Sequence, residues 1–346
     1  MAYSSIVKPS DYFNTKLYTG NGSSQSFTGV GYQPDFTWIK RRGSAEGHSL
    51  FDAVRGVQKR LVSNDNGGEA VVSNSLTAFG SDGFTLGGSD TVNGSDNYAS
   101  WNWKANGAGS ANTAGSINST VSANTTSGFS IVKYTGNGSS GATVGHGLTT
   151  TAPKIVLIKT TSGADAWTML NTNIDLNKYL SLNSNSAEIS DPMFNNTAPT
   201  TTVFTLDGDG QVNGNGVSLI AYCFSEVTGY SKFGSYKGNG ANFDNAFVYT
   251  GFKPSLVIIK KSNTTGNWVI EDNKRAGYNQ ANYHLYPNLT NGEGTNYYTD
   301  FLSNGFKIRD NPSDIGESGH TYIYMAFAEE PLVANSGSNG VPATAR

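Results

Sequence analysis

The sequence predicts an all-β protein made of three tandem β-sandwich repeats of about 100 residues each. Three observations lead to this fold class. The 346 residues include 42 glycines and 12% aromatic residues but only 14% charged residues, a composition typical of turn-rich β-structure. Asn-Gly pairs, which adopt the positive φ angles of hairpin turns at low cost, recur along the whole chain. A set of landmarks, finally, occurs three times.

The first landmark is the string YTGNG, at residues 18–22 and 134–138, with the near copy YKGNG at 236–240. A proline-led strand follows in each copy: PDFTWIK, PKIVLIK and PSLVIIK, which end at Lys40, Lys159 and Lys260. These lysines are about 119 and 101 residues apart, and the copies of the other landmarks are separated by nearly the same numbers of residues. The period is too long for a solenoid and long enough for each copy to bury a core of its own.

Each copy predicts its strands in the same order. The WIK, VLIK and VIIK runs are β-branched or aromatic and suit a buried strand. The later FTL, FTL and FKI strings alternate as a half-buried strand does, and an aromatic-rich strand closes each copy. No long stretch has helical periodicity. We expect each copy to be a sandwich of the jelly-roll or concanavalin-like kind.

The landmarks divide the chain into six parts. Residues 106–128 are almost entirely Ala, Asn, Gly, Ser and Thr and are expected to form a linker. The expected parts are an N-terminal arm (1–15), a first repeat (16–105), this linker (106–128), a second repeat (129–227), a third repeat (228–331) and a C-terminal tail (332–346).

Composition and charge exclude several functions. The net charge of −3 offers no basic surface for nucleic acid, and no apolar run is long enough for a membrane helix. The N-terminus has no apolar signal-peptide core. Cys223 is the single cysteine, so neither an intrachain disulfide nor a multi-cysteine metal site can form. We expect no cofactor.

An Asp-x-x-Arg pair gives the first candidate site. It occurs as Asp52 with Arg55 and again as Asp272 with Arg275, whereas the second repeat has Asn171 and Ile174 at these places. A carboxylate and a guanidinium could hold a polar ligand such as a sugar. A repeated element is more often part of the fold, so a covered ion pair that braces a loop is the favoured interpretation.

An oxygen-rich loop at residues 206–216 gives a weaker candidate. Asp207, Asp209 and Asn213 are ligand types that calcium accepts. The EF-hand pattern fails, because Val212 and Ser218 stand where Gly and Glu are required. We favour a plain Gly- and Asn-rich turn, and expect no metal site.

Trp101 and Trp103 lie two residues apart and therefore on one face of a strand. Exposed, they would form a stacking platform for sugar rings. The other repeats also carry apolar residues at the matching places, which favours core positions. We likewise expect Trp167 and Trp268 in a core or an interface.

Catalytic motifs are missing from the sequence. The histidines lie at no metal-ligand spacing, and no nucleophile motif is present. A carboxylate pair for glycoside cleavage has no sequence signal that would single it out. The chain is therefore predicted not to be an enzyme, and no catalytic residue is assigned.

The motifs YTGNG, GYQPDFTWIK, GFKPSLVIIK, GYSKFGSY and YIYMAFAEEP give the chain a family resemblance, over roughly residues 16–331. In these motifs the sequence resembles the repeat-containing virion structural proteins, of tail-fibre type, that tailed bacteriophages encode, especially marine ones. The resemblance implies a location on the phage particle and no chemistry, and the lectin-like character of the sandwich is an analogy of fold alone.

The resemblance and the composition together predict a non-enzymatic structural protein of a phage virion, made in the host cytoplasm. A tail fibre or tail-associated adhesin that contacts the host surface is the first expectation. A capsid decoration or head-fibre protein is the alternative within the particle, and a carbohydrate-binding lectin-like module or, less favoured, a glycan hydrolase are the alternatives outside it. The expected partners are other virion proteins, further copies in a homo-oligomer, with a trimer first, and a host-surface glycan.

Overall fold

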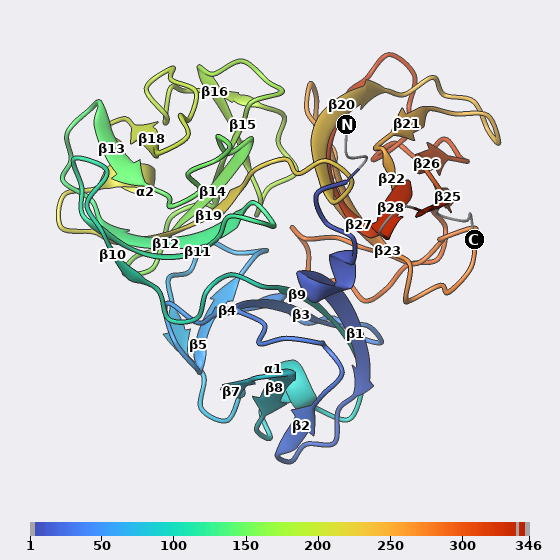
Figure 1. Ribbon diagram of the computed structural model, residues 1–346, viewed down its shortest axis with the longest axis horizontal. Helices are drawn as coiled ribbons and strands as arrows, with labels where there is room; N and C mark the ends of the chain where they lie inside the picture. The colour runs from blue at the N-terminus through green and yellow to red at the C-terminus, as the bar shows by residue number, and fades with distance from the viewer. Residues whose placement is uncertain (1–3, 337–338, 343–346) are drawn as a thin grey trace.

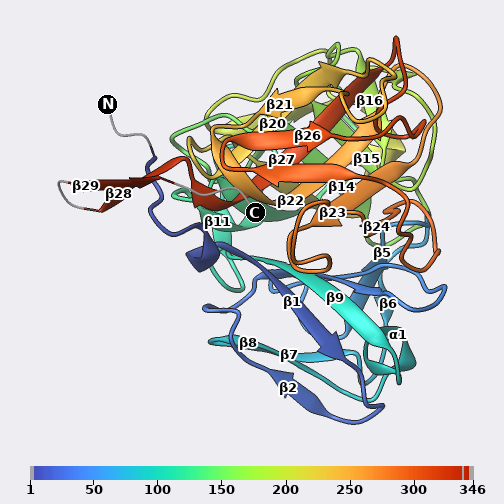
Figure 2. The same cartoon turned by 90° about the vertical axis from the view of Figure 1, so that its right-hand side faces the viewer.

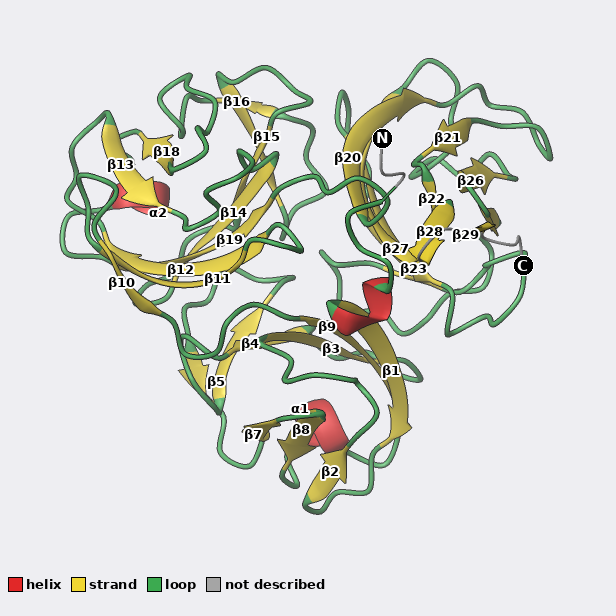
Figure 3. Cartoon of the chain, viewed as in Figure 1, coloured by secondary structure: helices red, strands yellow, loops and turns green. Residues whose placement is uncertain are grey.

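The computed structural model describes residues 4–336 and 339–342. Its ribbon forms three lobes around a common centre, and nearly all of the regular structure is strand (Figures 1 and 3). The helices of the described residues are short, and none has the length and apolar character needed to span a bilayer. The prediction of an all-β fold built from antiparallel sheets is confirmed.

The first unit is the lower, blue to cyan lobe of Figure 1. A six-stranded antiparallel sheet packs against a three-stranded sheet. The larger sheet has the order β1 (Phe13–Thr19), β9 (Asn97–Trp103), β3 (Phe36–Arg41), β4 (Ser49–Asp52), β5 (Lys59–Val62) and β6 (Ala70–Val71). The smaller has the order β2 (Gln25–Phe27), β8 (Gly83–Leu86) and β7 (Leu76–Gly80), and two short helices accompany the sheets, η1 (Pro9–Asp11) and α1 (Asp90–Asn93).

The second unit, the green lobe of Figure 1, repeats this plan with two extra strands on its larger sheet. That sheet has the order β10 (Ser110–Asn112), β11 (Ser119–Asn124), β12 (Phe129–Thr135), β19 (Ser218–Phe224), β14 (Ile155–Thr160), β15 (Thr168–Asn171), β16 (Lys178–Ser181) and β17 (Ile189–Ser190). The smaller sheet pairs β13 (Ala142–Gly145) with β18 (Val203–Leu206), and the helix is α2 (Gly210–Asn213).

The third unit is the orange to red lobe. Its larger sheet has the order β20 (Ser231–Lys237), β27 (Thr321–Pro331), β22 (Phe252–Lys261), β23 (Trp268–Asp272) and β24 (His284–Leu285). Its smaller sheet has the order β21 (Phe247–Tyr249), β26 (Gly305–Ile308) and β25 (Thr299–Leu302).

The landmark tyrosines occupy equivalent places in the three units. Tyr18, Tyr134 and Tyr236 lie on the strand that pairs with the closing strand of each unit. Each hydroxyl donates a hydrogen bond of 2.6–2.7 Å to a backbone oxygen near the turn before that closing strand. The finer jelly-roll or concanavalin-like form of the sandwiches stays a prediction.

Strand alternation divides the buried residues between two kinds of core. On β9, Tyr98 points into the sandwich of its own unit, whereas Trp101 and Trp103 point to the centre of the molecule. The closing strands β19 and β27 alternate in the same way. We call the shared cluster at the centre, to which all three units contribute, the central core. Both faces of the central strands of each large sheet are thus buried, which explains why the WIK, VLIK and VIIK strands carry almost no polar residues.

The linker expected at residues 106–128 is wrong as a description of that segment. It contains β10 and β11, and β11 pairs with β12 along its whole length, from Ser119↔Tyr134 to Asn124↔Phe129. Ile117 and Val121 are buried in the sandwich core of the second unit. These two apolar side chains lie four residues apart and help to hold this polar segment against the second unit.

The N-terminal arm expected at residues 1–15 is also shorter than predicted, because β1 begins at Phe13. Ile6 and Phe13 are both buried in the central core. At the other end, β28 (Val333–Ser336) and β29 (Asn339–Pro342) pair as a hairpin within the expected tail, and the hairpin projects from the body in Figure 2. Residues 1–3, 337–338 and 343–346 of these two segments lie outside the described residues.

Candidate functional site

Three aromatic side chains meet at the centre of the molecule, one from each closing strand. The ring centroids lie 6.3 Å apart for Trp103 and Phe224, 5.8 Å for Phe224 and Phe327, and 5.5 Å for Trp103 and Phe327. These residues are equivalent in the three units. The triangle therefore marks an approximate threefold axis within a single chain.

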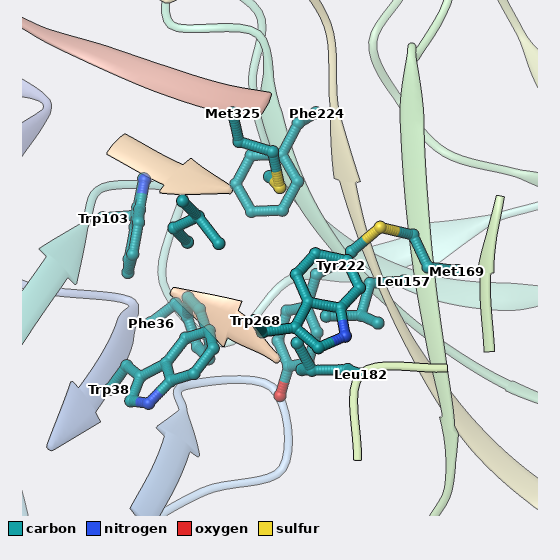
Figure 4. A pocket seen from close by; sticks show the side chains of 11 residues that line it. Phe36, Trp38, Trp103, Leu157, Met169, Leu182, Tyr222, Phe224, Trp268 and Met325 are labelled. Carbon is teal, nitrogen blue, oxygen red and sulfur yellow. The ribbon is translucent and has the colours of Figure 1, made fainter. Parts of the chain in front are cut away.

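A small apolar void of about 20 Å³ lies beside this triangle. Figure 4 shows side chains from all three units turned toward it. Its walls are Phe36, Trp38, Trp103, Leu157, Met169, Leu182, Tyr222, Phe224, Ile258, Trp268 and Met325. A void this small with apolar walls has no polar groups to hold a water molecule or a substrate.

Three lysines form a closed ring of contacts around the axis. They lie near the ends of β3, β14 and β22, which pair with the closing strands on the side opposite to the landmark tyrosines. Each of the three side chains is fully buried. Each ammonium donates to a backbone oxygen of the neighbouring unit: Lys40 to Thr290 at 3.1 Å, Lys159 to Asn66 at 3.0 Å and Lys260 to Asn185 at 3.3 Å. The first unit thus contacts the third, the second contacts the first, and the third contacts the second.

Burial lowers the pKa of each of the three lysines to about 8. The cause is desolvation, since a buried ammonium loses the hydration that favours its charged form. The acidic neighbours of each lysine offset only part of this effect. The ammonium groups are placed for holding carbonyl oxygens and lie out of reach of bulk solvent.

A glutamate in each unit strengthens the same ring through its backbone. The amides of Glu69, Glu188 and Glu293 each donate at 2.8 Å to a residue two positions after the lysine of a neighbouring unit. The acceptors are the oxygens of Thr161, Ser262 and Arg42. Each lysine contact is therefore paired with a backbone hydrogen bond in the opposite direction.

Indole groups make a second set of contacts between units. Trp167 donates its Nε1 proton to the oxygen of Val62 at 2.8 Å, and Trp268 donates to the oxygen of Ser181 at 2.9 Å. His48 takes the matching place in the first unit and faces the backbone of Tyr286 in the third. Burial holds the pKa of His48 well below its usual value, so the imidazole is neutral. The prediction that Trp167 and Trp268 lie in a core or interface agrees with these positions.

The Asp52–Arg55 pair lies at the junction of the first and second units. Nε of Arg55 donates to Oδ2 of Asp52, and both side chains are almost completely buried. The same carboxylate oxygen accepts a hydrogen bond of 2.8 Å from the hydroxyl of Tyr222 in the second unit. The ion pair thus ties its own loop and receives a donor from the neighbour.

The Asp272–Arg275 pair repeats this arrangement at the junction of the third and first units. Nε of Arg275 donates to Oδ2 of Asp272 at 2.6 Å, and that oxygen also accepts from Nε1 of Trp101 at 3.0 Å. Burial alone would raise the pKa of Asp272, but the charge and hydrogen bonds of Arg275 hold it below its ordinary value. Glu293, whose carboxylate lies 3.1 Å from Arg275, completes the network.

The remaining junction lacks both halves of this contact. The second unit has Asn171 in place of the aspartate and Ile174 in place of the arginine. The neighbouring donor position in the third unit is Met325, which has no proton to give. The ion pair is therefore present only at the two junctions where the adjoining unit supplies an O–H or N–H donor.

These positions decide between the two interpretations of the Asp-x-x-Arg pair. All four charged side chains, those of Asp52, Arg55, Asp272 and Arg275, are at most 1% exposed. A sugar could reach them only if the units separated. The geometry supports a structural role for both pairs. The sequence indicated this role because the Asp-x-x-Arg pattern occurs in two repeats.

The residues suggested for calcium are not gathered into a site. Asp209 caps α2 by accepting from the amide of Gln211 at 2.8 Å, and Asn213 is buried and bonded to Asn137 and Ser139. The side chain of Ser140 and the amide of Gly208 lower the pKa of the Asp207 carboxyl. Among the residues that the structure describes, no group of three or more His, Cys, Asp and Glu side chains is arranged to hold a metal ion.

The sugar-stacking alternative for Trp101 and Trp103 is wrong, because both side chains are buried in the central core. The core interpretation favoured from the sequence is the one the structure supports. Sequence reasoning missed that Trp101 also bonds to the third unit. The structure pairs Trp101 with Asp272 and Tyr222 with Asp52, and these pairings between units are not visible in the sequence.

Taken together, the buried charged groups near the centre bind one unit to the next. The lysines hold carbonyl oxygens, the carboxylates hold guanidinium, indole and phenol donors, and the rings pack into one core. Each unit is thus in direct contact with both of the others. The side chains of the three lysines and of the two Asp–Arg pairs are buried where they make these contacts.

Comparison with known proteins gives one result. Neither the curated proteins nor the solved structures contain a match to this chain. A family model described as a domain of unknown function (DUF7483) matches residues 8–331, which include all three units and their junctions. The chain therefore belongs to the DUF7483 family.

Proposed function

We propose that this chain is a non-enzymatic structural protein of a bacteriophage particle, and that it serves as a tail fibre component or tail-associated adhesin. The observation that carries the proposal is the use of the buried charged groups. The lysine ring and the two Asp–Arg networks join three sandwiches into one body. Such buried hydrogen bonds and ion pairs suit a component of a particle that is exposed outside the cell and has no disulfide bond to stabilise it. The single cysteine, Cys223, is buried and free.

The resemblance of the repeat motifs to virion structural proteins of tailed phages supports the same proposal. The surface chemistry fits as well. The chain has few charges and many Gly, Asn, Ser and Thr residues, which suits polar contacts with other proteins of a particle.

Further copies of the chain form part of the proposal, with a homotrimer as the first expectation. The faces of the units that point to the threefold axis are already occupied by each other. Contacts between copies would have to use outer faces of the units or the hairpin of β28 and β29, which projects from the body (Figure 2). Light scattering at micromolar concentration measures this directly: a mass of three times 36.6 kDa supports the trimer, and a constant mass of 36.6 kDa contradicts it.

Electron microscopy of purified particles, with gold-labelled antibody against this chain, tests the location. We expect label at the tail. Label over the shell would instead assign the chain as a capsid decoration or head-fibre protein. Absence of the chain from purified particles, with the protein found only in the soluble lysate, would overturn the proposal.

An adsorption assay tests the adhesin role separately. Purified chain added to host cells before infection should slow phage adsorption, because it occupies the same receptors. An unrelated β-sandwich protein at equal concentration is the control. Unchanged adsorption at saturating chain would contradict the adhesin role and leave a purely structural one.

A further inference from the structure

The third unit exposes three aromatic side chains close together in sequence. Phe243 is 71% exposed, Phe247 is 47% exposed and Tyr249 is 55% exposed. Phe247 and Tyr249 lie on β21, the edge strand of the small sheet, on either side of the buried Val248. Both rings therefore stand on the outer face of that sheet, about 7 Å apart along the strand. We call Phe243, Phe247 and Tyr249 the aromatic face.

The other two units show that the fold does not need these rings. By strand register, Phe247 corresponds to Ser26 and Thr143, and Tyr249 corresponds to Thr28 and Gly145. The sandwiches of the first and second units are formed with small residues at these outward positions. The aromatic residues of the third unit thus add exposed apolar surface that its own folding does not require.

The backbone of the preceding loop points to the same conclusion. Phe243 has a φ angle of 66°, in the left-handed region that bulky residues avoid. The next residue, Asp244, pairs with Lys307 at 2.6 Å, which fixes the loop to the outer face of β26. The chain therefore holds a large ring outward at a conformational cost of about 1–2 kcal/mol.

The charges beside the aromatic face are balanced. Lys307, the register partner of Phe247, pairs with Asp244, and Arg309 pairs with Asp300 at 3.3 Å. Two cations and two anions give no net charge to attract a polyanion such as a phosphorylated or sialylated polymer. They do provide hydrogen-bond donors and acceptors of both kinds next to the rings.

The size of the aromatic face limits the class of partner. For residues of typical aromatic area, the exposed fractions of the three residues sum to at most roughly 350 Å². A stable protein interface needs about 800 Å² on each partner. One or two sugar rings match the smaller area, and the C–H face of a pyranose packs on the negative face of an aromatic ring.

We propose that the aromatic face binds a neutral saccharide: Phe247 and Tyr249 stack on its rings, and the side chains of Lys307 and Asp244 bond to its hydroxyl groups. The inference rests on the proposed adhesin role, to which it gives a receptor class and a location. It replaces the Asp-x-x-Arg pairs as the glycan-binding residues, because those pairs are buried.

An array of immobilised oligosaccharides tests the inference with the full chain. The array carries neutral hexose and N-acetylhexosamine oligomers together with sialylated and phosphorylated glycans. We expect the wild-type chain to bind one or more neutral structures. The double variant Phe247→Ser/Tyr249→Thr, which takes the residues of the first unit, should lose at least tenfold in affinity while its melting temperature stays the same.

Tyr278→Thr is the matched control, because Tyr278 is 80% exposed on the loop between β23 and β24 and outside the small sheet. It should bind as the wild type does. No binding by the wild type, binding to charged glycans alone, or full binding by the double variant would each overturn the inference. If the double variant instead abolishes incorporation into particles, the face is a protein contact and the inference is wrong.

The two proposals fail in different ways. A chain found on the tail that binds no saccharide overturns the inference and leaves the proposed function standing. A chain that binds a neutral saccharide but is absent from particles does the reverse.

Discussion

The indole Nε1 of Trp101 lies 3.0 Å from Oδ2 of Asp272, although the two residues are 171 positions apart. Trp101 belongs to the closing strand of the first unit, and Asp272 ends β23 of the third. Arg275 completes this contact from two directions, because it pairs with the aspartate and lies over the indole ring at 5.5 Å. This hydrogen bond connects the first unit to the third, so the three units form a closed ring.

Replacement of Asp272 by alanine should therefore destabilise the whole molecule. It leaves the Arg275 guanidinium buried with only the Glu293 carboxylate, and it leaves the Trp101 donor without a partner. A loss of about 3–5 kcal/mol in the free energy of unfolding is expected, whereas Trp101→Phe should cost about 1–2 kcal/mol. Urea titration followed by tryptophan fluorescence measures both.

Asp11→Ala is the control for this pair, because the Lys8–Asp11 pair is largely exposed. It should change stability by less than about 1 kcal/mol. Equal effects of Asp11→Ala and Asp272→Ala would show that the buried pair has no special role in joining the units.

The third junction can be given the missing contact. Asn171→Asp with Ile174→Arg introduces the pair into the second unit, and Met325→Tyr introduces the donor opposite it. Each half alone should destabilise, since it buries polar groups without partners. We expect the triple variant to be about 1–2 kcal/mol more stable than the sum of the two halves, a coupling that a thermodynamic cycle measures. Additive effects would mean that Met325 and Asn171 do not face each other as donor and acceptor.

The lysine ring predicts that stability rises with pH above neutrality. Lys40, Lys159 and Lys260 have pKa values of about 8 in the folded protein, against about 10.4 when unfolded. Between pH 8 and 10 these lysines therefore bind more protons in the unfolded chain than in the folded one, so they make the free energy of unfolding increase with pH. Each lysine contributes up to about 3 kcal/mol across this window.

Buried groups of two kinds, a thiol and a set of tyrosines, oppose this trend as the pH approaches 10. Burial raises the pKa of the Cys223 thiol to about 12, so the unfolded thiol ionises first and stability falls as pH increases. Burial also raises the pKa of Tyr18, Tyr32, Tyr98, Tyr134, Tyr179, Tyr222, Tyr230, Tyr236, Tyr286, Tyr297, Tyr322 and Tyr324, so these side chains ionise first in the unfolded chain. Up to about pH 9.5 an unfolded tyrosine is mostly protonated, so the three lysines outweigh the thiol and the tyrosines over that range. Glu271, whose pKa burial raises to about 7, has completed its titration below pH 8 and leaves the window clear.

Chemical denaturation at pH 7.5, 8.5 and 9.5 measures the slope. The triple variant Lys40→Met/Lys159→Met/Lys260→Met should lose the rise, and Lys133→Met, at an exposed position of β12, should retain it. A wild-type stability that stays flat or falls over this range would show that the ammonium groups are hydrated.

The first glycine of the YTGNG string, Gly136 in the second unit, should tolerate no side chain. A Cβ at Gly136 would lie 2.4 Å from the oxygen of Gly214 and 2.6 Å from the carbonyl carbon of Asn213. Gly136→Ala should therefore destabilise by about 1–3 kcal/mol, because the turn must move away from α2. Gly210→Ala, where no atom lies within 4 Å of the new Cβ, is the matched control and should be nearly neutral. Equal melting temperatures for the two variants would contradict the close approach of these turns.

The fold class and the core positions of the tryptophans could be predicted because both depend on local pattern. Glycine content, Asn-Gly turns and strand-length apolar runs report directly on sheets and turns. Repeated spacing places Tyr18 and Tyr134 on matching strands without any knowledge of the fold. Residues 106–128 were misjudged because the polar composition outweighed the two apolar residues Ile117 and Val121, which are buried in the fold.

The contacts between units could not be predicted in the same way. A repeat states which residues are equivalent and is silent on how the copies face one another. Lys159 reads as the polar end of a strand, and only the fold shows that its ammonium reaches Asn66, 93 positions earlier. Phe247 and Tyr249 could have been noticed from the sequence, since the other copies have small residues there, but their exposure is a property of the three-dimensional structure.

Differential scanning calorimetry most directly tests whether the three units form a single cooperative body. Because the units share the central core and every junction has buried polar contacts, we predict one transition, with a calorimetric enthalpy about equal to the van't Hoff enthalpy. The Asp272→Ala variant should shift that single transition to lower temperature as a whole. Two or three resolved transitions, or a calorimetric enthalpy about three times the van't Hoff value, would show that the sandwiches unfold independently and would contradict the coupling described above.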